Sequence, residues 1–266
     1  MYGEFSVKHP DDFADFHVRV ASPSGLRKWL KPQVNFFLDE TASFNPLPRE
    51  QAYPMLEWGI NWCIAAHSHQ YLIFHAAVIE KHGSAVIMPA PPGSGKSTLC
   101  AGLVSRGWRL LSDELALFDM KSGTIQPLSR PINLKNESID VIKRFQPDAV
   151  MTAPVADTVK GTVALLRPPA ESVRRISESA TPAWIILPRY KRGAAANLTL
   201  QSKARTCQTL VEQSFNYDIH GRAGFAAITS LVDACYCYEL VYSDLEEANH
   251  MFTGLPDLPN ITRLAA

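Results

Sequence analysis

The 266-residue sequence predicts an α/β fold, in which a mixed sheet is flanked by helices and joined to a small β-rich N-terminal lobe. Three observations support this prediction. A glycine-rich loop at residues 90–97 lies between an apolar run and a helix-like run. Two β-like runs separated by a tight turn lead into that loop, and apolar runs alternate with helical segments after it. Residues 1–48 instead contain short strand-like runs and turns.

The composition limits the classes of protein to consider. Hydrophobic residues make up 46% of the chain and charged residues 20%, which predicts a packed core. Lys+Arg and Asp+Glu both number 26, and this balance argues against a nucleic-acid partner. No run approaches the ~18 apolar residues of a membrane helix. Five cysteines without a CxxC pair, and no leader-like N-terminus, predict a cytoplasmic protein without a membrane partner.

The N-terminal lobe, residues 1–48, is expected to contain strands at 16–20 and 33–38 because apolar and polar residues alternate there. A helix is expected over 50–70, where apolar residues recur every three or four positions. The residues predicted to share its apolar face are Met55, Trp58, Gly59, Trp62, Cys63 and Ala66.

The strands expected at 74–79 and 84–88 form an antiparallel hairpin that leads into the glycine-rich loop. A helix over 97–105 leaves the loop, and a short buried strand at 108–111 follows it. The carboxyl end of that strand delivers Asp113 and Glu114 to the side of the sheet where ligands bind in open α/β folds.

The later elements are less uniform. A hairpin is expected at 115–127, and residues 131–138 are expected to open a short helix. Residues 146–183 have little periodicity, which predicts a functional or mobile segment. The remaining expected elements are a strand at 183–187, helices at 206–214 and 221–234, a strand at 235–242 and a helix at 244–251.

The glycine-rich loop has the features of a phosphate-binding loop. Its glycines let backbone N–H groups turn toward phosphate oxygens without a Cβ in the way. Lys96 would reach the β- and γ-phosphates, the Ser97 hydroxyl would bind Mg²⁺, and the following helix directs its positive end at the anion. The residues expected to bind ATP are Ala90, Pro91, Pro92, Gly93, Ser94, Gly95, Lys96, Ser97 and Thr98.

Several side chains are candidates for chemistry beside the loop. In an extended chain Asp113 and Glu114 point to opposite faces, so one of them is expected in the site, and Asp113 is preferred. Asp113 would bind Mg²⁺ or take a proton from an attacking hydroxyl. A cationic side chain would neutralise the transferring phosphate. The candidates are the cations of residues 188–193, with Arg189 first among them, or else Lys160.

Short motifs along the chain resemble the catalytic domain of HPr kinase/phosphorylase, and more closely the HPr-kinase-related kinase A family. The shared landmarks are residues 74–78, 93–98 and 110–114. The related-kinase group adds residues 54–62, 130–138, 160–162 and 213–217. The resemblance covers most of residues 15–252, and it implies that residues 49–266 form an HPr-kinase-like P-loop catalytic domain.

The resemblance implies an ATP- and Mg²⁺-dependent transfer of phosphate to a serine hydroxyl. It implies that Asp113 is the base, that His75 lies at the site, and that Ser97 and Glu137 hold Mg²⁺. Relatives are often oligomers, which leaves a homo-oligomer open. The chain departs from the HPr enzyme in two places: an Asp-Glu pair replaces paired aspartates, and Thr98 stands where that enzyme has an acid.

Three functions remain open on the sequence alone. The first is an ATP-dependent kinase acting on a serine of a peptide or protein. The second is a kinase whose acceptor is a small-molecule hydroxyl. The third is a nucleotide-gated assembly factor that uses bound ATP as a switch, with Asp113 as a metal-anchoring acid only.

Overall fold

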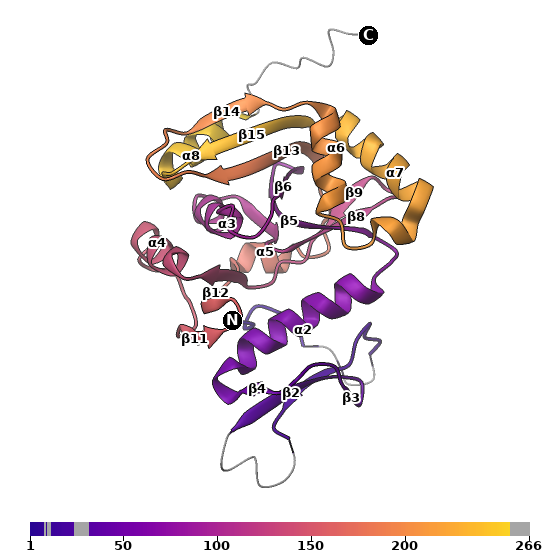
Figure 1. Cartoon of the computed structure of the whole chain (residues 1–266), viewed down its shortest axis with the longest axis vertical. Coiled ribbons are helices and arrows are strands. Elements are labelled where there is room, and N and C mark those ends of the chain that lie inside the picture. The colour runs from indigo at the N-terminus through magenta and orange to yellow at the C-terminus, as the bar shows by residue number, and fades with distance from the viewer. Residues whose placement is uncertain (8, 10–11, 24–31, 256–266) are drawn as a thin grey trace.

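A computed structural model describes residues 1–7, 9, 12–23 and 32–255 of the chain. Within these residues, a large mixed sheet carries helices on both faces, as the sequence predicts, and two smaller sheets lie beside it (Figure 1). In the described part of the chain, no helix combines the length and the apolar character needed to cross a bilayer.

The large sheet has the strand order β14-β15-β13-β6-β5-β8-β9, with β7 also paired to β5. The β5–β6 hairpin is antiparallel, as predicted, and places Val78 opposite Ile87. β13 runs parallel to both β6 and β15, so the sheet is mixed. The bounds are β5 Leu72–Lys81, β6 Ser84–Pro89, β7 Arg109–Ser112, β8 Leu115–Asp119, β9 Thr124–Gln126, β13 Thr181–Tyr190, β14 Asn197–Leu200 and β15 Tyr236–Tyr242.

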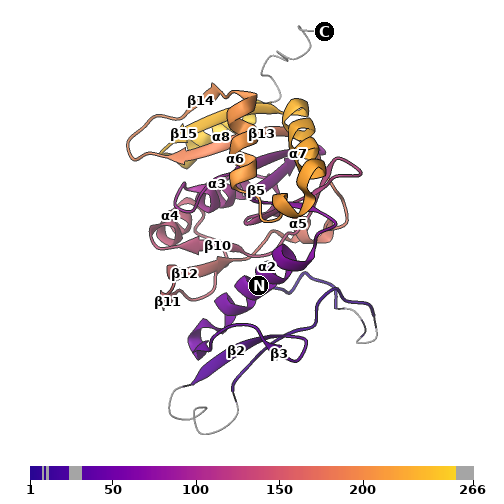
Figure 2. The same ribbon diagram turned by 45° about the vertical axis from the view of Figure 1, so that its right-hand side comes forward.

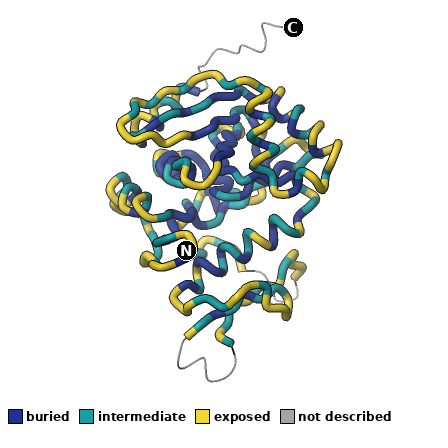
Figure 3. Tube along the Cα trace, in the orientation of Figure 1, coloured by how far each residue is buried: buried dark blue, intermediate teal, exposed yellow. Residues whose placement is uncertain are grey.

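Each face of this sheet packs against its own set of helices. Alternate residues of β5 enter different cores, with Ala77 on one side and Val78 on the other. The helices α3 (Lys96–Ser105) and α8 (Leu245–Thr253) contribute to the first core, and α6 (Lys203–Glu212) and α7 (Tyr217–Ala234) to the second. Figure 3 shows the buried segments concentrated in these strands and in α3.

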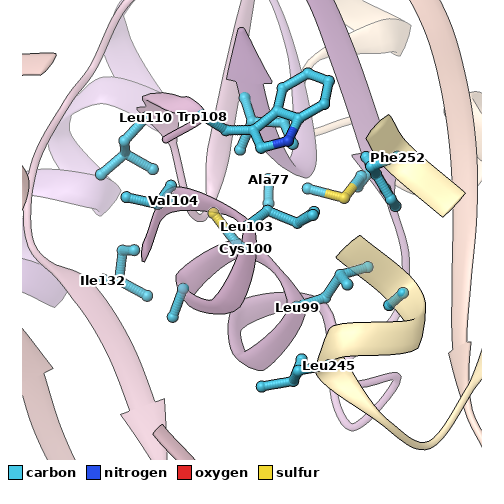
Figure 4. Close-up of a cluster of buried hydrophobic side chains, with 14 of the residues drawn as sticks. Ala77, Leu99, Cys100, Leu103, Val104, Trp108, Leu110, Ile132, Leu245 and Phe252 are labelled. Carbon is cyan, nitrogen blue, oxygen red and sulfur yellow. The ribbon is translucent and has the colours of Figure 1, made fainter. Parts of the chain in front are cut away.

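The helix that follows the glycine-rich loop is held by an apolar cluster. Leu99 and Leu103 of α3 gather with Trp108, Leu245 and Phe252 (Figure 4). The Trp108 and Phe252 rings meet edge to face, with centroids 5.8 Å apart. Burying five large side chains at about 1.5–3 kcal/mol each fixes the direction of α3, and with it the orientation of its N-terminus.

Residues 146–183, which have little periodicity in the sequence, nevertheless contain regular structure. β11 (Val155–Thr158) and β12 (Gly161–Leu166) form an antiparallel sheet with β10 (Ile132–Lys135), and α5 (Ala170–Arg174) follows. The strands are short and a register shift interrupts the β11–β12 pairing, which weakens the period-two signal. Residues 132–135 are likewise a strand, and the helix α4 (Glu137–Phe145) begins after it.

The N-terminal part forms a small sheet whose apolar face is completed by a helix from the next segment. It contains β1 (Val18–Ala21), β2 (Gln33–Leu38), β3 (Thr41–Ala42) and β4 (Leu47–Pro48), followed by the 3₁₀ turn η1 (Arg49–Gln51) and α2 (Ala52–His67). Figures 1 and 2 both show α2 between this sheet and the rest of the molecule. The division expected at residue 48 therefore falls just before a helix that packs on both parts.

The predicted apolar face of α2 is correct for only half of its members. Met55 and Cys63 are buried against Phe36, and a Cβ at Gly59 would collide with the Phe36 ring. The two tryptophans are different: Trp62 is 38% exposed and Trp58 is half-buried. The helix therefore presents one face to the small sheet and a second, aromatic face elsewhere.

Candidate functional site

The glycine-rich loop connects the end of β6 to the start of α3. Gly93 and Gly95 have φ values of +86° and +88°, which residues with a Cβ rarely adopt. The Tyr190 N–H donates to Ser94 O at 2.9 Å, and the Tyr242 hydroxyl donates to Gly95 O at 2.9 Å. The carboxyl ends of β13 and β15 therefore hold the loop in place.

A cavity of about 400 Å³ lies over this loop and the N-terminus of α3; we call it the loop cavity. Its lining includes every residue from Pro91 to Thr98, whereas Ala90 is buried beneath it. The first N–H groups of a helix have no partner within the helix, so they face the cavity as donors. The other lining residues are His75, Glu114, Asn133, Lys135, Asn136, Glu137, Ser138, Val141, Tyr190, Tyr242, Ser243 and Leu245.

Lys96 is a buried cation at the floor of the loop cavity. It is 6% exposed, and its Nζ donates to Ala90 O at 3.4 Å and to His75 O at 3.5 Å. Burial lowers the pKa of Lys96 to about 8, although the nearby Asp113 and Glu114 carboxylates oppose the shift. Lys96 therefore remains mostly protonated at neutral pH and places a positive charge beside the N-terminus of α3. The carboxylates that interact with this charge are Asp113 and Glu114.

Asp113 is the most buried acid of the site. Its Oδ2 accepts a hydrogen bond from the Asn133 N–H at 3.1 Å, and its residue is 5% exposed. Burial and the neighbouring Glu114 raise the pKa of Asp113 to about 6, against lowering contributions from Lys96 and the Ser97 hydroxyl. Asp113 does not line the loop cavity, but it is close enough to Ser97 and Lys96 to interact with both.

Glu114, the less favoured acid on sequence, is the one that lines the loop cavity. The Asn61 side chain of α2 donates to Glu114 Oε2 at 2.5 Å. Lys135 Nζ lies 3.9 Å from Glu114 Oε1. The backbone after β7 thus turns the two adjacent carboxylates in different directions, with Asp113 inward and Glu114 into the open space.

His75 borders the loop cavity from β5. Its Nδ1 lies 3.3 Å from Gln213 Oε1, and its ring meets Phe215 edge to face with centroids 6.0 Å apart. Burial and the positive charge of Lys96 lower the pKa of His75 to about 4. The imidazole is therefore neutral at physiological pH, and it can donate or accept a hydrogen bond but carries no charge.

A second cavity of about 760 Å³ adjoins the first; we call it the aromatic groove. His75, Pro92, Glu114 and Lys135 line both spaces, so the two meet at these residues. The remaining lining residues of the aromatic groove are Trp58, Asn61, Trp62, Ala65, Ala66, Leu115, Lys160 and Phe215. Among the predicted site residues, Lys160 belongs to this groove alone, with its Nζ 4.9 Å from the centroid of the Trp58 ring.

The structure does not bring Arg189 to the loop cavity. β13 extends to Tyr190, whose side chain lines that cavity, so strand alternation directs the Arg189 side chain to the opposite face. Glu137 lies at the exposed rim, where Arg192 NH2 is 3.5 Å from its Oε2. The structure therefore groups Lys96, Ser97, Asp113 and His75 closely, keeps Glu137 at the edge, and leaves Arg189 outside.

Sequence reasoning missed Asn133, Lys135 and Asn61. Asn133 and Lys135 are two residues apart on β10 and therefore point to the same side. A strand assignment for residues 132–135 would have revealed this alternation. Asn61 comes from the aromatic face of α2, and only the tertiary packing places it against Glu114.

A buried polar network continues behind Glu114 into α2. Arg130 hydrogen-bonds through its guanidinium to the Asn61 side-chain oxygen. Arg130 NH1 also lies 3.7 Å from Glu57 Oε2. Burial raises the pKa of Glu57 to about 7, with Arg130 opposing that shift. Through this network, the position of α2 is coupled to the orientation of Glu114.

The residues present fit a magnesium ion only together with phosphate. Within the described residues, no group of three or more His, Cys, Asp or Glu side chains could hold a metal ion. Asp113 Oδ1 is buried without a hydrogen-bond partner in the described part of the chain, and the Ser97 hydroxyl is close to the same carboxylate. Mg²⁺ commonly takes one or two protein oxygens and completes its shell with phosphate and water, which matches this donor set.

Comparison with protein families gives one match. A family model described as "SynChlorMet cassette protein ScmC" matches residues 54–128, which is less than half of the chain. The chain is similar to that family from α2, through the β5–β6 hairpin and the glycine-rich loop, to the segment just after β9. No curated protein matches the chain.

Proposed function

We propose that this protein is an ATP- and Mg²⁺-dependent kinase with an HPr-kinase-like P-loop core, which transfers the γ-phosphoryl group to a serine of a peptide or protein. The observation that supports this most strongly is the meeting of two cavities at His75, Glu114 and Lys135. One cavity lies over a glycine-rich loop and a helix N-terminus, which suit phosphate, and the other would give an acceptor access to it. The resemblance of short motifs to HPr-kinase-related kinases points to the same chemistry.

In this proposal, the glycine-rich loop binds the phosphates of ATP. The N–H groups of the loop and of the first turn of α3 donate to phosphate oxygens, and Lys96 neutralises the β- and γ-phosphates. Ser97 and Asp113 would hold Mg²⁺, which supplies further neutralisation of phosphate charge. The contact of Asp113 with Ser97 suits this metal-side role better than the role of base that the resemblance implies.

The acceptor hydroxyl would enter from the aromatic groove, and Glu114 would receive its proton. As the serine oxygen bonds to the γ-phosphorus, the bond from that phosphorus to the bridging oxygen breaks and ADP leaves. Lys135, 3.9 Å from Glu114, is placed to stabilise the charge on the transferring group. It takes the role that the sequence suggested for Arg189. His75 would orient the hydroxyl as a neutral hydrogen-bonding group.

The cellular setting is also part of the proposal. All five cysteines are free thiols, and burial is the main cause that raises the pKa of each one. Buried, unpaired thiols suit a reducing cytoplasm. A homo-oligomer remains compatible with this assignment.

The test is transfer from γ-labelled Mg-ATP into fractions of a lysate from the source organism. We expect label on a peptide or protein with the wild type. Lys96→Ala should reduce the transfer rate by about 10³-fold, since removal of one preorganised charge-stabilising group commonly costs 10²–10³. Lys121→Ala, in the exposed turn between β8 and β9, is the matched control and should keep full activity.

Two acid variants separate the proposed roles. Glu114→Gln should bind Mg-ATP normally but fail to transfer phosphate, whereas Asp113→Asn should lose the Mg²⁺ dependence of ATP binding. Label confined to small molecules would identify a metabolite kinase instead. Free phosphate as the sole product, with ATP-dependent association of a partner, would contradict the kinase assignment and favour a nucleotide switch.

A further inference from the structure

We infer that the aromatic groove binds a peptide segment in which an aromatic or aliphatic residue and an acidic residue lie close to the phosphorylated serine. This inference rests on the proposed function, because it names the acceptor of the same site. It goes further by assigning the recognition to particular side chains of α2, of the 213–216 segment and of the turn that carries Lys160.

The groove has an apolar wall made from two distant parts of the chain. Trp62 lies four residues after Trp58 on α2, and Ala65 and Ala66 lie three and four residues after Trp62, so all four share one side of the helix. Phe215 faces them from the segment between α6 and α7. Small alanines between large rings leave space into which an incoming side chain can insert.

The rings of this wall are exposed but held in place. Trp62 is 38% exposed and Phe215 is 48% exposed. Trp62 meets Phe44 edge to face with centroids 5.2 Å apart, and also contacts His67 at 5.6 Å. Phe215 is held through its N–H, which donates to Ile73 O at 2.9 Å, and by its contact with His75. Exposed aromatic side chains with restricted positions are typical of binding anchors.

The charges of the groove favour an acidic ligand. Lys135 and Lys160 contribute two positive charges, while Glu114 contributes one negative charge and His75 is neutral. Among the described residues, no carboxylate lies within ion-pair distance of the Lys160 ammonium, which rests over the Trp58 ring instead. An acidic group of the acceptor would supply the missing partner without competing for Lys135.

The groove is continuous with the loop cavity, which fixes the direction of the ligand. The serine would lie at the shared residues His75, Glu114 and Lys135, next to the phosphate. The apolar neighbour would lie along α2, and the acidic neighbour beside Lys160. An extended peptide satisfies all three positions, because residues two apart in a strand-like chain are about 6–7 Å apart.

The experiment is a binding selection from a displayed library of random peptides, carried out on the full-length protein without nucleotide. We expect the wild type to enrich peptides that contain a serine near an aromatic or aliphatic residue and near an acid. Trp62→Ala and Phe215→Ala should each reduce recovery of those peptides by about tenfold. Lys160→Gln should keep the apolar preference and lose the acidic one.

The matched control is Tyr53→Ala, since Tyr53 is an exposed aromatic residue of α2 that does not line the groove. Recovery by this variant should equal that of the wild type. The inference would be overturned if the wild type recovered peptides without a preference for apolar residues. It would also be overturned if Tyr53→Ala and Trp62→Ala reduced peptide recovery equally. The affinity for Mg-ATP is measured in a separate experiment. Failure to bind Mg-ATP would refute the proposed kinase function, and the peptide selection would still test the binding groove independently.

Discussion

The loop cavity and the aromatic groove share a border but are built in different ways. The loop cavity is built around one continuous stretch, Pro91 to Thr98, and side chains from other elements complete its lining. The groove has no such stretch outside α2: its other lining residues come from separate segments around His75, Pro92, Glu114, Lys135, Lys160 and Phe215. The proposed binding of phosphate would thus depend on local backbone geometry, whereas the proposed binding of an acceptor would depend on tertiary packing.

This difference has a consequence for substitution. A change in the loop alters a backbone that two strands hold in place, so its effect should spread over every phosphate contact. A change in the groove removes one side chain and leaves the backbone intact. Variants of the two regions should therefore separate nucleotide binding from phosphoryl transfer, and the three predictions below test that separation.

The largest effect is expected for Gly95→Ala. An added Cβ would lie 2.5 Å from Tyr242 Oη and 2.9 Å from Tyr190 Cβ, at a φ of +88°. Steric overlap and left-handed strain together should lower the free energy of unfolding by about 2–4 kcal/mol. Displacement of the loop N–H groups should weaken Mg-ATP binding by about a hundredfold. Denaturant unfolding and calorimetric titration measure the two effects.

Gly123→Ala is the matched control for this substitution. Gly123 also has a positive φ, +70°, but nothing lies within 4 Å of its added Cβ. We expect backbone strain alone to lower the free energy of unfolding by about 1–2 kcal/mol, and we expect the nucleotide affinity to stay unchanged. Equal ATP affinities for the two variants would show that the geometry of the glycine-rich loop does not decide nucleotide binding.

A smaller effect is expected for Asn61→Ala, at the border of the two cavities. Asn61 donates to Glu114 and accepts from Arg130, so its loss frees the Glu114 carboxylate from α2. Phosphoryl transfer should fall by about tenfold, in the range of other lost hydrogen bonds to charged groups. Mg-ATP affinity should stay within about twofold, because no loop contact changes.

Gln51→Ala serves as the comparison, since the Gln51 side chain donates from the end of η1, just before α2, to Asp157 O at 3.1 Å, away from both cavities. It should leave the transfer rate unchanged. Parallel losses of nucleotide affinity and transfer in Asn61→Ala would mean that the groove and the loop are not separable. Steady-state kinetics with a selected serine peptide, together with ATP titration, provide the test.

The same contrast explains how much the sequence could predict. The hairpin, the loop and α3 are contiguous, and apolar periodicity together with glycine spacing defines them locally; the structure places all three where expected. The antiparallel hairpin expected at 74–88 predicted that the sheet is mixed, and the antiparallel pairing of β5 and β6 confirms that hairpin. The role of the loop in nucleotide binding stays a prediction.

The groove escaped prediction because no local pattern encodes it. Trp58 and Trp62 have the spacing of core residues, yet Gly59 lets the small sheet approach the other side of α2 and leaves the tryptophans to face the groove. Lys135 was hidden by the weak signal of β10. Strand alternation correctly predicted that the Asp113 and Glu114 side chains point in different directions. Which of the two acids turns inward depends on how the chain leaves β7.

The smallest expected effect is a pH dependence confined to the loop cavity. The pKa of Asp113 is raised to about 6, so below that value the carboxyl becomes protonated and would no longer hold the proposed Mg²⁺. The pKa of Lys96 is lowered to about 8, so above that value its positive charge is lost. Affinity for Mg-ATP should therefore be highest between these two values and fall about fourfold at about pH 5.5, as the ionised fraction of Asp113 falls.

The alkaline decrease should begin above about pH 8, because bound phosphate favours the charged form of Lys96 and a deprotonated Lys96 must take up a proton when ATP binds. His75→Gln is the control: with a pKa of about 4, His75 is already neutral across this range, so both limbs should stay where they are. Titration of Mg-ATP affinity against pH measures the profile. An acidic limb that persists in Asp113→Asn, or that moves in His75→Gln, would assign the titration to another group and place the metal-side acid elsewhere in the cavity.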